Sequence, residues 1–573
     1  MVGVEKMNAE EMVVMESEDD QRGYAATRSL GHPNGVISIA EDQDLKGCST
    51  TGLRRKIDGQ LWEIGAVKQE MRELVSSAWP MVFTMVMFYL ANVITISFVG
   101  QLGALDLAAV GLASMFCNVT GISIAVGLSS GLETQAAQLY GAGQYRQVGV
   151  AAQRATVCIL AALLPVAGIW AVTGPLLVAV GIDADVAHRA ASFVRMMILG
   201  LPAVAVQETV RKYLQCQGVM LPFVFVSCVA NVVHIAACRL FISPLSPASL
   251  GVPGAALTLV LTYYFNNALI CAYCLCSGAH LLTWGGWTRE CVEHVPAFLK
   301  LAVPGAGMIC LEWWCFELMT LMSARLGTAV VAAQTVMFST TAIFFMVPLG
   351  FSIAVGARVG NFLGAGKPVS AQRVAVLGVI CSACITVVAS LTLYGFRLQW
   401  AQMFTQDVVV IDEIMRVMPL QASFLVFDTI QGVVSGVIRG CGNQHVGFFV
   451  NLFSYYCVAM PVAVTLAFFF DMGLMGLWFG LAMGAVTQAS SLTFFVYRVD
   501  YQKLADGAAE RCAYLSGCDE GLGAEGPKGL SGVEVCGGAG RSSHVDFMCH
   551  DVNTVIITSS FVEGGDRSKV LEV

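Results

Sequence analysis

Long apolar runs dominate the sequence between residues 71 and 499, where charged side chains are sparse. A helix needs roughly 20 consecutive apolar residues to cross the hydrocarbon core of a bilayer. Of the 573 residues, 56% are hydrophobic and only 13% are charged, about half the usual charged share of a soluble domain. Because a water-soluble fold of this size could not bury so much apolar surface, we expect a protein that crosses the membrane many times.

Twelve segments are long and apolar enough to be membrane helices. They lie near residues 74–98, 108–133, 150–173, 193–214, 220–242, 254–278, 298–324, 332–357, 375–399, 414–438, 446–470 and 474–498. We therefore predict an all-α integral membrane protein with twelve transmembrane helices.

The two ends of the chain have a different composition. Residues 1–70 and 500–573 are rich in Gly, Ser and acidic side chains, and we predict that both are flexible tails. Residues 71–499 carry 15 acidic and 18 basic side chains, so the net charge of −8 comes from the tails. The charge balance therefore says nothing about the substrate, and no basic patch suggests nucleic-acid binding.

Basic residues gather in the short loops on one side of the predicted helices. This set consists of Arg146, Arg154, Arg211, Lys212, Arg289, Lys300, Arg358, Lys367, Arg373, Arg439 and Arg498. Short loops rich in Lys and Arg face the cytoplasm, so we predict that both termini are cytoplasmic. The N-terminus shows no cleavable signal peptide, and the membrane could be the plasma membrane or that of a vacuole-like organelle.

The two halves of the helical region look like copies of one another. Landmark residues recur at a nearly constant spacing of 222 to 224: Pro80 and Pro304, Gly141 and Gly364, Gln207 and Gln431, Gly218 and Gly442, Gly254 and Gly476. Because each copy has an even number of helices, the copies share one topology. We predict two six-helix lobes, 71–285 and 286–499, related by a pseudo-twofold axis along the membrane normal.

Three acidic residues fall deep inside predicted helices. Glu312 and Glu317 lie in the seventh helix, and Asp428 lies midway along the tenth. An unpaired carboxylate at this depth costs at least about 2.5–3.5 kcal/mol, and no Lys or Arg shares the centre of either helix. Because burial disfavours the charged form, we expect these groups to take up and release protons. The alternative is a carboxylic acid that hydrogen bonds keep permanently neutral.

Helical geometry separates the first two acids. Five residues rotate a helix by about 500°, which leaves Glu312 and Glu317 some 140° apart. One is expected to face a cleft between the lobes and the other the interior of the second lobe. Glu133 and Glu208 lie near helix ends, and we interpret them as structural, with Glu208 paired to Arg211 and Lys212 at i+3 and i+4.

Other side chains are candidates for the lining of that cleft. Aromatic and polar groups near the acids include Phe316, Asn451 and Tyr455, while Asn92 is the polar residue of the first helix. Aromatic faces beside a carboxylate would suit an organic cation, although ordinary packing is an equal alternative. Pro80 and Pro304 occupy matching positions in the repeat and are candidate hinges.

The chain resembles the eukaryotic branch of the multidrug and toxic compound extrusion (MATE) family over about residues 71–499. The resemblance rests on the stretches FVGQLGALDLAAVGLAS, GLETQAAQLYGAGQYRQVGVAAQRA, LQCQGVMLP, GVPGAALTLVLTYY, KLAVPGAGMICLEWWCFEL, VPLGFSIAVGARVGNFLGAGKP and SGVIRGCGNQHVGFFVNLFSYYCVAMP. It implies a V-shaped pair of lobes and export of organic substrates in exchange for protons. Acids of the seventh and tenth helices would serve coupling, which indicates Glu312, Glu317 and Asp428. Bacterial members place an acid in the first helix, but Asn92 cannot titrate.

Our hypothesis is a proton-coupled antiporter that exports organic cations or other xenobiotics by alternating access. Protons and substrate would compete for Glu312 and Asp428. The alternatives are a Na⁺-coupled or uniport carrier of organic acids or other metabolites, and a lipid flippase of similar architecture. No motif indicates an enzyme, a cofactor or a metal site, and we expect a monomer in the bilayer.

Overall fold

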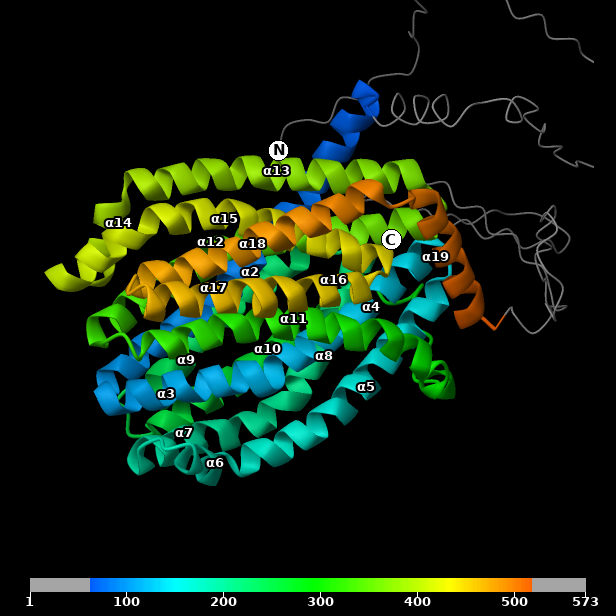
Figure 1. Ribbon diagram of the computed structural model, residues 1–573. Coiled ribbons are helices and arrows are strands. Elements are labelled where there is room, and N and C mark those ends of the chain that lie inside the picture. Colours follow the sequence, from blue (N-terminus) through cyan, green and yellow to red (C-terminus); the bar gives the residue numbers. More distant parts are fainter. Residues whose placement is uncertain (1–61, 518–573) are drawn as a thin grey trace, which may run out of the picture. The chain divides into compact units, whose positions relative to one another are not determined.

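The computed structural model describes residues 62–517, which form helices and no strand. With the labels of Figure 1, the helices of the first half are α2 (Ile64–Val99), α3 (Ala104–Cys117), α4 (Ser123–Gly141), α5 (Tyr145–Ala171), α6 (Thr173–Ala179), α7 (Ala184–Met197), α8 (Leu201–Cys216), α9 (Leu221–Phe241) and α10 (Val252–Ser277). Those of the second half are α11 (Val295–Ser323), α12 (Thr328–Gly364), α13 (Pro368–Gly395), α14 (Arg397–Phe404), α15 (Val408–Cys441), α16 (Gln444–Asn451), α17 (Met460–Val464), α18 (Gly473–Arg498) and α19 (Tyr501–Leu515).

Short π-helical segments interrupt two of the long helices. The segment η3 (Asn118–Ile122) joins α3 to α4, and η6 (Leu452–Ala459) and η7 (Thr465–Phe469) flank α17. A π-helical turn widens the backbone spiral and leaves carbonyl groups free for other partners. These joints make α3–α4 one continuous segment and α16–η7 another.

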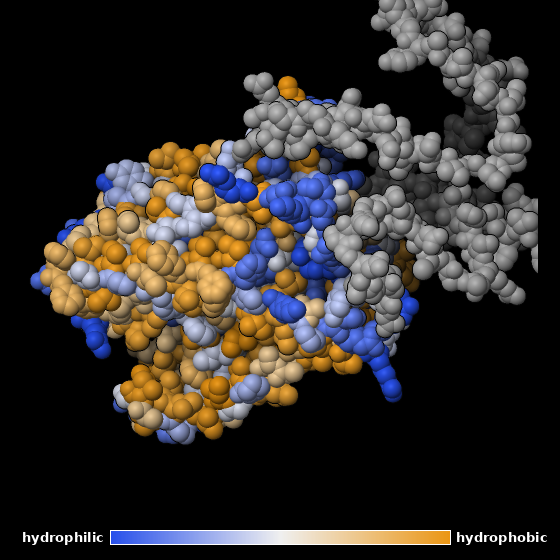
Figure 2. Space-filling model, turned by 45° about the vertical axis from the view of Figure 1, so that its right-hand side comes forward, coloured by the Kyte–Doolittle hydropathy of each residue, from blue (hydrophilic) through white to orange (hydrophobic). Residues whose placement is uncertain are grey.

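Eleven helical segments between residues 62 and 517 are long and apolar enough to span a membrane. They match eleven of the twelve predicted spans, and the remaining prediction, 414–438, lies within the 34-residue helix α15. Several observed helices are longer than predicted, as in Ile64–Leu102 against 74–98, because polar turns continue these helices beyond the apolar core. Figure 2 shows a broad hydrophobic surface, as expected for a face that contacts lipid.

Each lobe has its own apolar core. We call residues 71–285 the first lobe and residues 286–499 the second lobe. One large cluster of buried residues is built mainly from the first lobe, and another entirely from the second, around Phe424 and Trp478. In the second lobe α15 lies between α13 and α18 (Figure 1).

Glycine contacts between the lobes reveal the predicted pseudo-twofold axis. A β-carbon on Gly127 of α4 would lie 2.4 Å from Cα of Ala306 in α11. At the repeat-related positions, a β-carbon on Gly350 of α12 would lie 2.5 Å from the backbone nitrogen of Val82 in α2. A second pair of contacts follows the same rule. Gly141 packs against Asn361, and the repeat counterpart of Gly141, Gly364, packs against Gln138, the counterpart of Asn361. Reciprocal contacts of this kind are the signature of a twofold interface.

Buried ion pairs hold the lobes together near these glycines. Glu133 of α4 lies 2.5 Å from Lys212 of the first lobe and 3.4 Å from Arg439 of the second. The predicted pairing of Lys212 with Glu208 is therefore wrong. Lys212 pairs with Glu133 instead, because its side chain reaches across to α4. The predicted pair of Glu208 with Arg211 is present.

A second ionic contact between the lobes involves the start of α2. Arg358 of α12 lies 2.5 Å from Glu70 and 2.7 Å from Glu73. Glu70 was assigned to a flexible tail of residues 1–70, but α2 begins at Ile64 and Glu70 is buried. Residues 1–61 lie outside the described part of the chain, so the rest of that prediction stays untested.

The predicted flexible tail 500–573 is wrong for its first part. Residues 501–515 form α19, which Figure 1 shows lying across the right-hand end of the bundle. Tyr501, Ala505 and Ala508 are buried, because the apolar side chains of α19 fall on one face that packs against α12 and α13. We call this end of the bundle the α19 end. Residues 518–573 lie outside the described range.

Candidate functional site

Two of the predicted acids meet inside the second lobe. The amide nitrogen of Gln431 donates one hydrogen bond of 3.0 Å to Glu312 Oε1 and another of 3.0 Å to Asp428 Oδ1. Gln431 lies three residues after Asp428 on α15, so both side chains project from one face of the helix toward α11. The result is a bridge in which one neutral amide holds two carboxyl groups. We call Glu312, Asp428 and Gln431 the acid site.

No basic residue in the described part of the chain forms an ion pair with the acid site. Asp428 is only 2% exposed, and Glu312 is partly buried. None of the ion pairs between residues 62 and 517 includes Glu312, Glu317 or Asp428. The other acids of the helix interiors, Glu133 and Glu208, are paired. A charge without a partner in this position requires a proton, water or a bound cation.

Packing on α11 sets the direction of Glu312. Phe316, one turn further along the same face, packs against Phe338 and Phe424 with ring centroids 6.2 Å apart. Cys315 is completely buried in the same core. Glu312 therefore faces the interior of the second lobe, and not a cleft between the lobes.

Glu317 points in a different direction. Seven residues make almost two helical turns, so Glu317 lies on the same face of α11 as Cys310, within about 20°. The thiol of Cys310 lies 3.5 Å from Ser123 Oγ of the first lobe, and the indole of Trp314 donates 2.9 Å to the Val119 carbonyl in η3. The face that carries Glu317 is thus the face that α11 presents to the first lobe.

Two of the predicted lining residues of the second lobe, Asn451 and Tyr455, are buried. Asn451 and Tyr455 have no exposed surface, so neither lines an open cleft in this structure. Asn451 donates 2.8 Å to the Met308 carbonyl and accepts 2.8 Å from Gln488. In this structure Asn451 and Tyr455 face the core of their own lobe, and the partly buried Phe316 packs against that core. A role in lining a cleft stays a prediction for all three.

Several buried polar atoms around the acid site have no hydrogen-bond partner within the described part of the chain. They are Gln431 Oε1, Ser435 Oγ, Ser454 Oγ, Tyr455 Oη and Gln488 Oε1. The Tyr455 hydroxyl is close enough to both carboxyl groups to interact with them electrostatically. Unpaired polar atoms in a buried place are costly, so water or a small bound species would stabilise this cluster.

The remaining candidates lie elsewhere. Asn92 of α2 is exposed and makes no hydrogen bond with the acid site. Pro80 lies in α2 and Pro304 in α11, and both helices continue past their proline. Their role as hinges stays a prediction.

Sequence reasoning missed Gln431 as a site residue and recognised it only as a repeat landmark. Its spacing of three residues from Asp428 was a usable signal, since i and i+3 share a helix face. Its second contact, to Glu312 on another helix, could not be read from the sequence. Gln488 was missed for the same reason.

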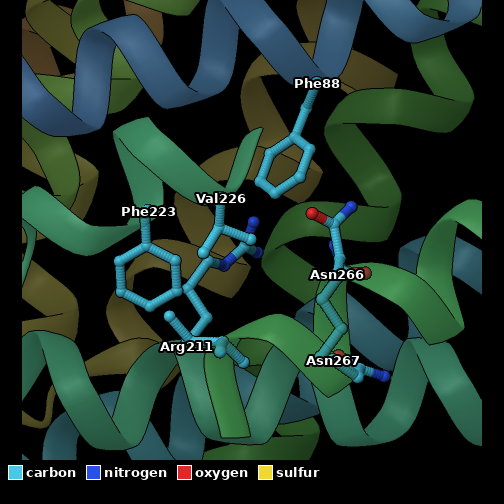
Figure 3. Close-up of a pocket in the computed structure, with 8 residues that line it drawn as sticks. Phe88, Arg211, Phe223, Val226, Asn266 and Asn267 are labelled. Carbon is cyan, nitrogen blue, oxygen red and sulfur yellow. The ribbon is translucent and has the colours of Figure 1, made fainter. Parts of the chain in front are cut away.

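The first lobe contains a pocket at the position related to the acid site. Figure 3 shows Phe88 above this pocket, with Asn266 facing it and Phe223 on the other side. With the repeat spacing of 224, Phe88 corresponds to Glu312 and Gln207 to Gln431. With the spacing of 222 found at Gly254 and Gly476, Asn266 corresponds to Gln488. We call this cavity the first-lobe pocket.

The first-lobe pocket keeps the amides of the acid site and lacks its acids. The counterpart of Asp428 is Val204, and the guanidinium of Arg211, which also lines the pocket, is paired with Glu208. Asn266 Oδ1 and Gln207 Oε1 have no partner among the described residues. Of these two repeat-related sites, only the one in the second lobe therefore contains acids without an ion pair. No group of three or more potential metal ligands was found within residues 62–517.

The sequence matches a known family model twice. The model MatE covers residues 80–240 and residues 304–465, one match in each lobe. These matches fall on the same repeat that the glycine contacts reveal.

Proteins of similar sequence carry related names. The chain is 34% identical over 450 residues to multidrug and toxin extrusion protein 2 of Mus musculus and 35% identical over 445 residues to multidrug and toxin extrusion protein 1 of Homo sapiens. Each alignment covers 78% of both proteins. Protein DETOXIFICATION 16 of Arabidopsis thaliana is 35% identical over 452 residues, which cover 78% of this chain and 92% of the relative.

Solved structures agree with this relationship. The eukaryotic MATE transporter AtDTX14 superimposes with a TM-score of 0.75 at 31% identity, covering 78% of this chain and all of that one. A multidrug resistance MATE transporter in an outward-facing conformation gives a TM-score of 0.67 at 19% identity, which supports the fold alone.

Proposed function

Because the chain belongs to the multidrug and toxin extrusion (MATE) family, we propose that it exports organic cations in exchange for protons. Protonation of Glu312 and Asp428 would compete with the bound cation. The two lobes would expose the acid site to each side of the membrane in turn.

One observation carries this proposal: a single neutral amide bridges two carboxyl groups that have no basic partner between residues 62 and 517. Two carboxylates in one buried site repel each other, so the site is unfavourable when both are charged and empty. A proton relieves this repulsion, and so does an organic cation. Because binding of the proton lowers the affinity of the site for the cation, and binding of the cation lowers its affinity for the proton, no second coupling site is needed.

The amide of Gln431 suits both states of the site. Its NH₂ group donates a hydrogen bond to each carboxyl group in this structure and can do so when the acids are charged. Its unpaired Oε1 is an acceptor for the O–H of a protonated acid. Gln431 is thus a positioning residue that keeps the two acids together while their charge changes.

The cycle begins with cation bound to the deprotonated acids. In the outward-facing state protons bind and the cation leaves. The protonated protein returns, and loss of the protons restores the site. Glu317, on the face of α11 that meets the first lobe, would draw the cation in, and the helices would bend at Pro80 and Pro304.

The orientation in the membrane is also part of the proposal. The basic loops support a cytoplasmic position for both termini. The α19 end, where the lobes contact each other, would then be the cytoplasmic end, and the structure would represent a conformation closed on that side. The protein would act as a monomer in the plasma membrane or in a vacuole-like organelle.

A transport assay tests the proposal. Purified protein in vesicles, given an outwardly directed proton gradient, should accumulate a fluorescent organic cation. Glu312→Gln and Asp428→Asn should each reduce gradient-driven uptake by about 100-fold, because each removes a titrating group that alternates between proton and cargo. Asp412→Asn, on an exposed position of the same helix as Asp428, should transport normally.

The same assay separates the alternatives. Uptake driven by a Na⁺ gradient at equal pH would indicate Na⁺ coupling. Uptake of organic anions would indicate a carrier of organic acids. Uptake that does not depend on a gradient of any ion would indicate a uniporter. Movement of labelled lipid between leaflets would indicate a flippase. Proton-driven uptake that survives both substitutions would overturn the assigned roles.

A further inference from the structure

The helix α19 begins immediately after the last membrane helix. Two residues, Val499 and Asp500, separate it from α18. The Asp500 side chain caps α19 by accepting hydrogen bonds of 3.0 Å from Gln502 N and 3.4 Å from Lys503 N. An N-cap fixes the start of a helix, so this end of α19 is firmly attached to the second lobe.

The first half of α19 is embedded in the second lobe. Tyr501, Ala505 and Ala508 are buried in a cluster formed largely by α12, α13 and α15. The exposed side chains Gln502 and Lys503 lie on the opposite face. This half of α19 is therefore an extension of the second-lobe fold.

The second half of α19 packs against the first lobe. Cys512 and Leu515 are buried in the cluster built mainly from first-lobe residues. The Ser516 hydroxyl donates 2.5 Å to Gln144 Oε1, in the loop after α4. Within 15 residues, α19 thus passes from the core of one lobe to the core of the other.

Arg511 lies where the two lobes meet. Its Nε donates 3.0 Å to Gln138 Oε1 of the first lobe, and its terminal nitrogen donates 3.4 Å to the Cys441 carbonyl of the second. Gln138 in turn donates 3.0 Å to the Gly440 carbonyl. Arg511 thus contacts both lobes, and the bond from Gln138 to Gly440 joins the two lobes directly beside it.

We propose that α19 is a strap that ties the lobes together at the α19 end and must release the first lobe before that end can open. The inference rests on the proposed alternating access, since a strap has no function in a rigid body. The first-lobe contacts are the ones to break, because the other half of α19 is capped and buried in the second lobe. The strap would hold the closed conformation and slow its opening.

Hydrogen exchange and transport together test the strap on the full chain in lipid nanodiscs and vesicles. Arg511→Ala should raise amide exchange in residues 509–516 by about tenfold and leave residues 501–508 protected, because only the first-lobe half is released. The rate of cation exchange should rise by about threefold or more, since the closed conformation loses stabilisation. Lys503→Ala removes a charge from the exposed face of the same helix and should change neither measurement.

A cross-link provides the second test. Gln144→Cys together with Ser516→Cys introduces one thiol on each side of a contact that a hydrogen bond of 2.5 Å between the side chains now makes. Oxidation should reduce transport by about tenfold or more, and reduction should restore it, because a covalent strap cannot release the first lobe. The same double variant kept reduced is the control.

The outcomes distinguish this inference from the proposed function. If the unmodified protein transports no cation under a proton gradient, the proposed function fails. If it transports but Arg511→Ala leaves both exchange and transport unchanged, or the oxidised cross-link transports normally, the strap is overturned.

Discussion

The acid site of the second lobe and the first-lobe pocket descend from the same position in the repeat, but only one carries unpaired charge. Both keep their amides, Gln431 in one and Gln207 in the other. Glu312 is replaced by Phe88 in the first lobe, where the nearby charge of Arg211 is paired with Glu208. We infer from this comparison that the role of a buried acid depends more on its partner than on its depth in the membrane.

The other buried acids support this distinction. Glu133 sits between Lys212 and Arg439 and joins the lobes, so its charge serves the fold. Glu312 and Asp428 share an amide and form no ion pair with a basic residue between residues 62 and 517, so in the proposed function they bind a proton or a cation. Each prediction below tests one side of this difference.

The largest effect is expected when a paired charge is broken. Glu133→Gln would leave Lys212 and Arg439 buried without a counterion, which should lower the free energy of unfolding by about 3–5 kcal/mol. Denaturant unfolding in detergent measures the loss. Glu290→Gln breaks the exposed pair with Arg146 and should cost less than about 1 kcal/mol. A Glu133→Gln protein as stable as the unmodified one would contradict the structural role.

The next effect separates the two repeat-related amides. Gln431→Ala removes both hydrogen bonds to the acids and should reduce proton-driven uptake by about tenfold, since a bond to a charged group contributes about 1.5–3 kcal/mol. Gln207→Ala, in the first-lobe pocket, should change uptake by less than about twofold, because Gln207 makes no hydrogen bond with another described residue. Equal losses in both variants would show that the lobes share the coupling.

The smallest effect concerns Glu317. Glu317→Gln removes a negative charge from the face of α11 that meets the first lobe, and should raise KM for the cation by about threefold with little change in kcat. The effect should increase at low ionic strength, because salt screens the attraction. Glu317→Asp keeps the charge and should behave like the unmodified protein. A complete loss of proton coupling in Glu317→Gln would instead place this residue in the acid site.

The sequence was sufficient to predict the membrane helices and the repeat. Long apolar runs must be helical in a bilayer, and recurring landmarks such as Pro80 and Pro304 expose the duplication. The depth of Glu312 and Asp428 followed from counting residues along each helix. Their common partner did not, because Gln431 reaches Glu312 across two helices that are distant in sequence.

The helix α19 shows a signal that was present and overlooked. Tyr501, Ala505, Ala508, Cys512 and Leu515 recur at helical spacing after an Asp cap, which is the pattern of an amphipathic helix. The acidic and glycine-rich composition of the whole segment obscured it. The ion pair of Lys212 with Glu133 had no such signal, since helical spacing favoured Glu208 instead.

Proton release on cation binding is the most direct test of the central claim that proton and cargo compete for the acid site. Purified protein in weakly buffered detergent would be mixed with an organic cation while a pH indicator records the change. We expect about one proton to be released per cation bound, and none from a protein that carries both Glu312→Gln and Asp428→Asn. Cation binding of normal affinity without proton release in the unmodified protein would contradict the account.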